Sequence, residues 1–444
     1  MTDSRLAAVV MAAGLGTRMH SDLPKHLHPL LGLRVVDWVL QAAREAGANP
    51  LVVVASPATK DVYDDSILVA VQQEPRGTGD AVAAAEEALE GFDGRVLVLD
   101  AAVPMLRADH LRGLVGAHGD ASADVTLLSF SPDLPLPYGR VIRNGEGLVE
   151  EIVEEKDATP EQRRVRELNT SIYVYEAAPL WQSLAKLDSS NAQGELYLTD
   201  TIRHIVAGGG RAAAWDCEDG LAPLGINNRA ELAIAAATLR DRINEAHMLA
   251  GVTIVDPATT WIDSTVELEP DVTVQPFTAL RGVTRAAAGA EIGSHTVVVD
   301  AVIGARATLG PFCYVRPGTV LEDETKAGTF VEIKNSRIGA GTKVPHLSYI
   351  GDADIGEGTN VAAGNVTANF SHRPGAEKGR TTIGSNVRTG VDNTFKAPVT
   401  VGDDAWIFPG TVITEDVPAG SLAGFPPHQV NKERWVYERG SGDD

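Results

Sequence analysis

The sequence predicts two folds in succession, an α/β domain with a mostly parallel sheet and then an all-β solenoid of six-residue repeats. In the first half, short apolar strands alternate with amphipathic helices, which is typical of a parallel sheet covered on both faces. In the second half, helical periodicity disappears and β-branched residues recur six positions apart. A chain of 444 residues is also too long for one hydrophobic core.

The strands and helices of the first half follow one another at short intervals. We expect strands over Leu6–Met11, Leu51–Ala55 and Val96–Leu99, and helices over Val35–Ala46 and Gly79–Leu89. This alternation predicts a Rossmann-like sheet, and ligands of such sheets bind outside the carboxyl ends of the strands.

A long helical pattern over Asn227–Leu249 separates the two halves, with Leu232, Leu239 and Ile243 among its apolar positions. It is interpreted as a connector, or equally as part of the first domain, and the two interpretations differ only in where the boundary falls. The predicted division is a first domain over 1–226, a linker helix over 227–250, a β-solenoid over 251–435 and a frayed tail over 436–444.

The repeats of the second half favour a triangular coil. Three six-residue sides would make one turn, with the aliphatic residue pointing inward and small residues at the corners. The inward positions include Ile338, Val344, Ile350, Ile355, Val361, Val401, Ile407 and Ile413. Because the period persists over roughly 150 residues, a chance run of β-branched residues is disfavoured.

Composition excludes several classes of function. The formal net charge of −22 disfavours a sequence-independent nucleic-acid binder, which needs clustered Lys and Arg, but allows a small phosphorylated ligand. The two cysteines, Cys217 and Cys313, have no metal-ligand spacing and indicate a reducing, cytoplasmic setting. No apolar run approaches the ~20 residues of a membrane-spanning helix, so no membrane partner is expected.

A glycine-rich loop follows the first predicted strand. Gly14 and Gly16 let the backbone approach a ligand closely, and the exposed N–H groups of such a loop bind phosphate. Arg18 and Lys25 add positive charge. Alone, the loop could equally be an ordinary tight turn, since it matches neither the Walker loop nor the dinucleotide fingerprint.

The complete string from Met11 to Met19, with Asp22-Leu-Pro-Lys25, resembles the signature of the sugar-phosphate nucleotidyltransferases. Further segments resemble that family in the expected order: Gln72–Gly79, Pro137–Arg140, Glu154–Thr159, Asn169-Thr170 and Asn227–Arg229. With the hexapeptide half included, the chain is similar along nearly its whole length to the bifunctional UDP-N-acetylglucosamine pyrophosphorylase/glucosamine-1-phosphate N-acetyltransferases.

This resemblance implies a left-handed parallel β-helix after the nucleotidyltransferase domain, and a set of roles in the first domain. The loop residues Ala13 and Gly14 would hold the triphosphate with Arg18 and Lys25 as catalytic cations. The remaining binding residues would be Gln72, Gly77 and Thr78 for the base, Gly139, Glu154 and Asn169 for sugar and ribose, and Asn227 for Mg²⁺. The implied reaction joins UTP and N-acetylglucosamine-1-phosphate and releases pyrophosphate, a transfer that depends on positioning and charge neutralisation.

One position departs from the family. Where the family has the Asp that is the other protein ligand of Mg²⁺, the string Val98-Leu-Asp-Ala-Ala-Val-Pro104 places Ala102. Since Mg²⁺ is usually held by one or two carboxylates plus phosphates, we expect a weakened metal site. Asp100 lies two residues earlier on the same face of the strand and could supply the charge, or could be only a solvated carboxylate.

The segments Phe330–Asn335 and Val344–Gly351 resemble the acetyltransferase motifs of the family. The reaction needs a base for the amine proton as the amine attacks a thioester, and His suits that task near neutral pH. The resemblance assigns His346 as the base with Glu332 positioning it. It implies that the sugar phosphate is held by Arg316, Lys334 and Lys378. It also implies that the amino sugar or the developing oxyanion is contacted by Tyr349, Asn360 and Asn369.

The end of the chain that would bind the acyl donor differs from the family pattern at Gly390–Asn393, Phe408-Pro409 and Phe370. A reshaped donor pocket is expected. Acetyl-CoA is the expected donor for acetylation of glucosamine-1-phosphate, and a different acyl group is the alternative. By resemblance the enzyme is a homotrimer with active sites between subunits.

Three functions remain open on the sequence alone. The chain catalyses both reactions of UDP-N-acetylglucosamine synthesis, or it is an acetyltransferase whose first domain only binds a nucleotide sugar, or it is a nucleotidyltransferase whose solenoid only assembles the oligomer. His346 and Glu332 count against the third, and Ala102 separates the first two.

Overall fold

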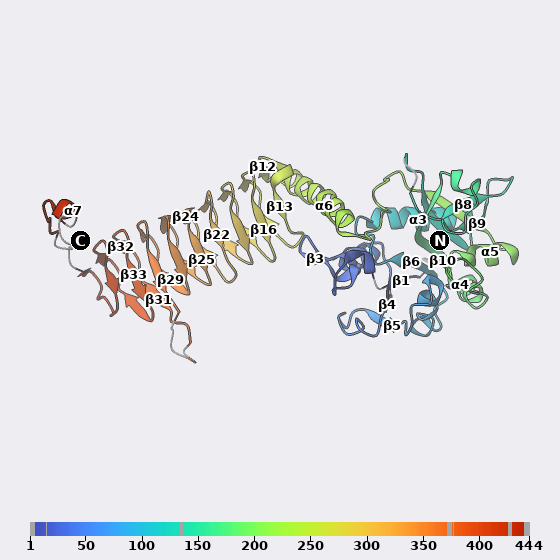
Figure 1. Cartoon of the computed structure of the whole chain (residues 1–444), viewed down its shortest axis with the longest axis horizontal. Helices are drawn as coiled ribbons and strands as arrows, with labels where there is room; N and C mark the ends of the chain where they lie inside the picture. The colour runs from blue at the N-terminus through green and yellow to red at the C-terminus, as the bar shows by residue number, and fades with distance from the viewer. Residues whose placement is uncertain are drawn as a thin grey trace. The chain divides into compact units, whose positions relative to one another are not determined.

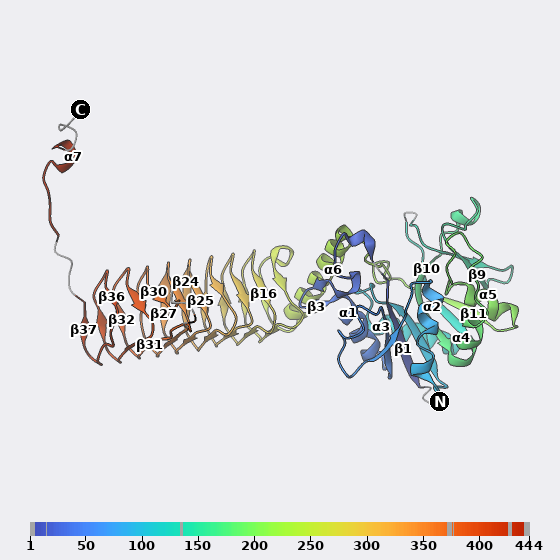
Figure 2. The same ribbon diagram turned by 60° about the horizontal axis from the view of Figure 1, so that its bottom comes forward.

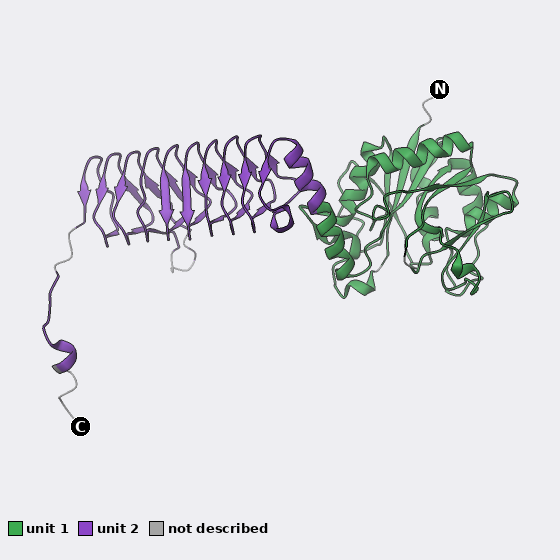
Figure 3. Cartoon of the chain, turned by 90° about the horizontal axis from the view of Figure 1, so that it is seen from above, with its two compact units in different colours: residues 1–239 green, residues 240–444 purple. Residues whose placement is uncertain are grey.

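The computed structural model describes residues 5–14, 16–133, 136–370, 375, 377–424 and 429–438. The chain forms two compact units, Met1–Leu239 and Arg240–Asp444 (Figure 3). Each unit has its own hydrophobic core, so each is described by itself.

The first unit is built on one mixed, mostly parallel sheet whose main path has the order β11-β7-β10-β6-β1-β4-β5 (Figure 1). Strand β10 is antiparallel to β6 and β7, and the hairpin of β8 and β9 pairs with its start. The strands are β1 Leu6–Ala12, β4 Leu51–Ala55, β5 Leu68–Val71, β6 Arg95–Asp100, β7 Val125–Phe130, β8 Arg140–Arg143, β9 Val149–Val153, β10 Leu168–Glu176 and β11 Ala212–Asp216, with a separate hairpin of β2 Pro29–Leu30 and β3 Leu33–Arg34.

Helices cover both faces of this sheet, as the alternating pattern predicts. One apolar cluster joins the sheet to Val36 and Leu40 of α1 and to Leu111 of α3, and the other joins it to Val82 of α2 and Ile202 of α5. The helices are α1 Val35–Glu45, α2 Thr78–Ala83, α3 Ala108–Ala121, α4 Ala177–Leu184 and α5 Asp200–Ala207, and short 3₁₀ turns are η1 Thr17–Met19, η2 Lys25–Leu27, η3 Glu87–Leu89 and η4 Gln162–Arg164.

Most predicted elements are confirmed within one or two residues, but the helix expected over Gly79–Leu89 is wrong in its second half. Helix α2 ends at Ala83, and the chain continues through a turn into η3. The backbone bonds Ala85 N to Val82 O and Glu86 N to Ala83 O span three residues, so the last turn tightens and the α-helical ladder stops.

The long helix between the halves is α6, Arg229–Leu249. Its first part packs Ala235 and Leu239 into an apolar cluster of the first unit. Its last part belongs to the second unit, where Ile243 packs on the solenoid core and the buried Asn244 donates to the carbonyls of Pro257 and Thr260. The division between the compact units falls inside this helix, between Leu239 and Arg240.

The second unit is a parallel β-helix whose short strands stack in three columns (Figure 2). The first column is β12 Thr253–Ile254, β15 Thr273–Val274, β18 Glu291–Ile292, β21 Thr308–Leu309, β24 Lys326–Thr329 and β27 Lys343–His346, followed by β32 Arg388–Thr389, β35 Trp406–Ile407 and β37 Leu422–Ala423. The second is β13 Trp261–Ile262, β16 Ala279–Arg281, β19 Val297–Val299, β22 Tyr314–Val315, β25 Glu332–Lys334, β28 Tyr349–Gly351, β30 Val366–Ala368, β33 Thr394–Lys396 and β36 Val412–Ile413. The third is β14 Glu267–Leu268, β17 Arg285–Ala286, β20 Val302–Ile303, β23 Val320–Leu321, β26 Arg337–Ile338, β29 Ala353–Ile355, β31 Thr381–Ile383 and β34 Val399–Val401.

The interior of the coil is a column of stacked aliphatic side chains. Val298, Val315, Ile333 and Ile350 pair successively in register and are 17, 18 and 17 residues apart, which is one turn of three six-residue sides. All eight inward positions that the periodicity predicts are buried, with exposures of 5% or less. The hexapeptide pattern is therefore confirmed as the origin of the core.

One corner of the coil carries a ladder of stacked rings. Phe277, His295, Phe312 and Phe330 follow one another with centroid separations of 4.8, 4.6 and 5.4 Å. All four have φ near +55 to +60°, a backbone conformation that is costly for residues with a side chain, and the stacking offsets part of that cost.

A short helix, α7 Trp435–Glu438, lies in the segment beyond the coil, and residues 439–444 of the predicted tail lie outside the described residues. Within the described ranges, no helix combines the length and apolar character that a membrane span requires.

The stacked interior predicts a large effect of truncating one inward side chain. Ile333 is fully buried between Val315 and Ile350, so Ile333→Ala should cost about 2–5 kcal/mol through lost burial and a residual cavity. Urea unfolding followed by circular dichroism measures this loss. Val302→Ala, at a position 44% exposed on a neighbouring column, is the control and should change stability by less than about 0.5 kcal/mol. Equal effects of the two changes would contradict the packed-column interpretation.

Candidate active sites

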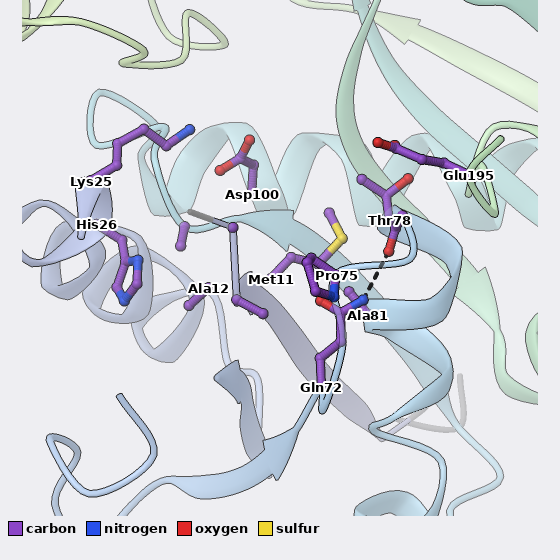
Figure 4. Close-up of a pocket in the computed structure, with 14 residues that line it drawn as sticks. Met11, Ala12, Lys25, His26, Gln72, Pro75, Thr78, Ala81, Asp100 and Glu195 are labelled. Atoms are coloured by element: carbon purple, nitrogen blue, oxygen red, sulfur yellow. Dashed lines mark hydrogen bonds between the residues drawn. The ribbon is translucent and has the colours of Figure 1, made fainter. Parts of the chain in front are cut away.

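The first unit holds a cavity of about 260 Å³ at the carboxyl ends of β1, β5 and β6. This is where a sheet of this kind binds ligands. Figure 4 shows its walls, and the predicted residues that line it are Ala13, Gly14, Lys25, Gln72, Gly77, Thr78 and Asp100. Arg18, Asn227, Gly139, Glu154 and Asn169 lie outside its lining.

The glycine-rich loop holds Lys25 at one end of this cavity. Gly16 has φ +60°, and a Cβ there would lie 2.7 Å from Cβ of Lys25. A side chain at position 16 would therefore push Lys25 out of place. Gly14 has open space on the side where a Cβ would stand, which leaves the backbone accessible to a ligand.

The other end of the cavity is shaped by Gln72, Gly77 and Thr78. Gln72 Nε2 donates to Gly77 O at 3.1 Å and to Asp80 Oδ2 at 2.8 Å, which fixes the orientation of its amide. Thr78 Oγ1 accepts from Leu198 N at 3.1 Å. Gly77 has φ +121°, and a Cβ there would meet Leu196 O at 2.5 Å, so only glycine fits. These three residues form one rigid edge of the cavity.

A second group of predicted residues meets at the start of β8 and β10. Asn169 N donates to Gly139 O at 2.8 Å, and a Cβ on Gly139 would lie 3.5 Å from Glu154 Oε2 and 3.6 Å from Asn169 Cβ. Burial raises the pKa of Glu154, while the hydrogen bond from Thr199 Oγ1 at 3.1 Å opposes that rise. Gly139, Glu154 and Asn169 thus form one cluster with a buried carboxyl.

The residues predicted around Mg²⁺ do not all present free oxygens. Asn227 Oδ1 accepts from Arg18 Nη2 at 2.9 Å, and Asp100 Oδ1 accepts from the backbone N–H of Ala102 at 2.8 Å. Ala102 is fully buried in an apolar cluster with Met19, Leu30, Val35, Met105 and Ile226. Position 102 therefore contributes no metal ligand.

The donor set nevertheless fits a magnesium ion that arrives with a triphosphate. Asp100 lines the cavity and has a second carboxylate oxygen, and Asn227 carries an amide oxygen, both of the hard type that Mg²⁺ prefers. Mg²⁺ commonly takes one or two protein carboxylates and completes its shell with phosphates and water. Asp100 supplies one carboxylate, the lower of those two numbers, and Asn227 adds an amide oxygen.

His26 is a cavity residue that the sequence analysis did not single out. It is 3% exposed, and burial, followed by the charges of Lys25 and Arg34, lowers its pKa to about 4, so the ring is neutral at physiological pH. Its Nε2 has no hydrogen-bond partner among the described residues. Its position directly after Lys25 was the available signal.

In the second unit, predicted residues gather on adjacent turns of the coil. Glu332 and Tyr349 are register partners on β25 and β28, and Lys334 pairs with Gly351. His346 ends β27 and is exposed. Asn360 forms the bridge between Lys343 and Arg388 on the column that contains His346, and is also exposed.

Asp352 joins several of these side chains and was missed by the sequence analysis. It accepts from Asn335 Nδ2 at 2.6 Å and from Asn369 Nδ2. Burial alone would raise the pKa of Asp352, but those hydrogen bonds and the charges of Lys334 and Lys378 lower it. Its position at a corner of the coil, beside the predicted motif ending at Gly351, was the only hint.

Two predicted cations lie together, whereas Glu332 and His346 are not joined. Lys334 lowers the pKa of its neighbour Lys378, which is the effect expected of two nearby ammonium groups. Glu332 Oε1 accepts from Arg316 Nη1 at 2.7 Å. Among the described residues, no hydrogen bond connects Glu332 to His346. The geometry therefore presents a cationic group suited to phosphate, with an exposed imidazole on the adjacent column.

The folds and sites together define a nucleotidyltransferase-type α/β unit joined to a β-helix with a second, cationic site. Residues 8–191 match the family model of the MobA-like NTP transferase domain. Over 98–99% of its length the chain is 47% identical to the bifunctional protein GlmU of Kineococcus radiotolerans, 45% to that of Corynebacterium efficiens and 43% to that of Mycobacterium tuberculosis, covering 93–96% of those proteins. The chain belongs to this family of bifunctional GlmU proteins, and the resemblance found in the sequence is confirmed.

The glycine at position 77 generates a prediction with an internal control. Gly77→Ala would force a Cβ against Leu196 O, so the KM for UTP should rise at least about tenfold. The acetyl-transfer rate of the same variant should not change, because that site lies in the other unit. Gly145→Ala, where the added Cβ meets open space, is the matched control for uridylyl transfer. An unchanged KM in Gly77→Ala would contradict a role for Gly77 in UTP binding.

Proposed function

We propose that the chain catalyses the two reactions of UDP-N-acetylglucosamine synthesis, which supply a precursor of cell-wall polymers. Its β-helix acetylates glucosamine-1-phosphate with acetyl-CoA, and its α/β unit then joins the product to UTP. The observation that carries this proposal is full-length similarity to bifunctional relatives, which align with both units. The alternative of a first domain that only binds a nucleotide sugar gains no support from those relatives.

In the α/β unit, an oxygen of the sugar phosphate attacks the α-phosphorus of UTP in line, and pyrophosphate leaves. Ala13, Gly14, Arg18 and Lys25 hold and neutralise the triphosphate, and Gln72, Gly77 and Thr78 hold the uracil. The cluster of Gly139, Glu154 and Asn169 orients the sugar. Such a transfer needs no covalent intermediate, only alignment and charge neutralisation.

Mg²⁺ is the proposed cofactor of this unit, held by Asn227 and Asp100 together with the triphosphate. When bound, it neutralises phosphate charge. Arg18 stands close enough to Asn227 to donate to its side-chain oxygen, so the same amide can hold the guanidinium before nucleotide arrives. With Ala102 contributing no oxygen, we propose that the metal is bound more weakly than two carboxylates would bind it.

In the β-helix, the amine of glucosamine-1-phosphate attacks the thioester carbonyl of acetyl-CoA. His346 takes the amine proton as the C–N bond forms, and the thiol of coenzyme A leaves. Arg316, Lys334 and Lys378 hold the sugar phosphate, Tyr349, Asn360 and Asn369 contact the sugar, and Glu332 acts through its ion pair with Arg316. We propose a homotrimer in the cytoplasm, where the free, buried thiols of Cys217 and Cys313 stay reduced.

The metal assignment is tested by Asp100→Asn. Removing the carboxylate should weaken Mn²⁺ binding in the presence of UTP at least about tenfold and raise the Mg²⁺ concentration for half-maximal pyrophosphate release by a similar factor. Electron paramagnetic resonance of free Mn²⁺ measures binding directly. Asp120→Asn, an exposed position on α3, controls for the change in charge. Unaltered Mn²⁺ binding in Asp100→Asn would refute Asp100 as a ligand.

The reverse change, Ala102→Asp, restores a carboxylate at the position where the family has its metal ligand. It should lower the Mg²⁺ concentration for half-maximal uridylyl transfer. Since Ala102 is packed against Met19 and Met105, the melting temperature must be measured alongside, because a carboxylate buried there is costly. A folded variant with no gain in metal response would mean that position 102 is irrelevant to the metal.

The base is tested by His346→Ala. Thiol release from acetyl-CoA with glucosamine-1-phosphate should fall at least about 100-fold. Uridylyl transfer by the same preparation is the control and should keep its rate. A variant that acetylates as fast as the parent would show that another group takes the amine proton.

A further inference from the structure

A second cavity of the first unit, of about 340 Å³, is walled by arginines in a chain whose net charge is −22. Arg140 enters it from β8, Arg163 and Arg164 from η4, and Arg166 from the following segment. Leu136 and Leu168 add an apolar wall. The guanidinium group of Arg140 is buried, whereas Arg163, Arg164 and Arg166 are exposed to water.

Fewer carboxylates than arginines surround this cavity. Among the described residues, two carboxylates pair with these arginines: Glu155, which lies 2.7 Å from Arg140 and 3.4 Å from Arg163, and the fully exposed Asp133, 3.8 Å from Arg166. The Arg164 side chain makes no ion pair or hydrogen bond with any described residue. The cavity therefore keeps about two uncompensated positive charges, a field that attracts a dianion.

Arg140, in the buried part of the wall, does not have all of its hydrogen-bond donors paired within the described ranges. Its side chain is only 4% exposed, and its Nε has no hydrogen-bond partner in the described part of the chain. The contact from Nη2 to Glu155 Oε2 is short, but Oε2 accepts no aligned hydrogen bond, so both groups keep unused capacity. Buried guanidinium N–H groups are normally partnered, and the Nε of Arg140, which water does not reach, has no partner among the described residues.

The cavity lies behind the proposed sugar site. Arg140 follows Gly139, Glu155 follows Glu154, and Leu168 precedes Asn169, while Arg140 and Leu168 are register partners. Leu168 and Asn169 are successive residues of β10, so their side chains point to opposite faces of the sheet, and Leu168 is the one that lines the arginine cavity.

We propose that this arginine cavity binds a small dianionic oxyanion, a phosphate ester or a dicarboxylate, as a site separate from the nucleotide cavity. Arginine forks match both anions through paired N–H donors. One further expectation rests on the proposed function. Occupation of the arginine cavity should change the KM for the sugar phosphate in uridylyl transfer, because both sites share the ends of β8 and β10.

Hydrogen–deuterium exchange of the full chain tests the site without requiring activity. Inorganic phosphate and malonate serve as probes, and peptides spanning 160–168 are followed. We expect either probe to slow exchange there in the parent and in Arg211→Ala, which removes an exposed arginine elsewhere in the unit, but not in Arg164→Ala. Because the Arg164 side chain has no described partner, its removal should leave the fold intact.

Each outcome decides the proposal. Protection by phosphate alone identifies a phosphate ester as the natural ligand, by malonate alone a dicarboxylate, and by both a general dianion site. No protection in the parent, or equal protection in Arg164→Ala, would overturn it.

In a kinetic experiment, phosphate should shift the KM for N-acetylglucosamine-1-phosphate about fivefold more in the parent than in Arg164→Ala. If the protein did not catalyse uridylyl transfer, only this kinetic experiment would fail, and the exchange experiment would still test the site.

Discussion

The stacking of inward aliphatic side chains, turn upon turn, is the interaction on which the second unit depends. Because Val315, Ile333 and Ile350 lie directly above one another, the outward side chains of neighbouring turns also stand in columns. Glu332 and Tyr349 meet for this reason, although 17 residues separate them. The site of the β-helix is thus arranged by its interior, and the apolar core and the polar site are two faces of one repeat.

The first unit positions its site residues in a different way. Its parallel strands are apolar along nearly their whole length, so the polar residues of the first cavity lie at their carboxyl ends: the loop after β1, Gln72 after β5, and Asp100 at the end of β6. Two glycines make this edge rigid, Gly16 against Lys25 and Gly77 against Leu196. Preorganised positions of this kind suit a reaction that needs alignment more than a nucleophile.

Periodicity was enough to predict both folds, and motifs were enough to predict half of the residues that line the first cavity, because each signal is local in the chain. Residues whose surroundings are set only by the folded chain were missed. His26 has no motif of its own, and its lowered pKa comes from burial and from Lys25 and Arg34. Asp352 gains its role only when the coil brings Asn335 and Asn369 to it. The hydrogen bond between Arg18 and Asn227 spans 209 positions, a pairing that no spacing rule could supply.

Helix α6 has a consequence for any attempt to divide the protein. Its first half completes an apolar cluster with Ala235 and Leu239, and its second half closes the end of the coil through Ile243 and Asn244. A cut at the point where the compact units separate would leave each fragment with half of α6, and such a short helix is not stable in water by itself. Fragments meant to stand alone should therefore overlap, both keeping the whole of Arg229–Leu249.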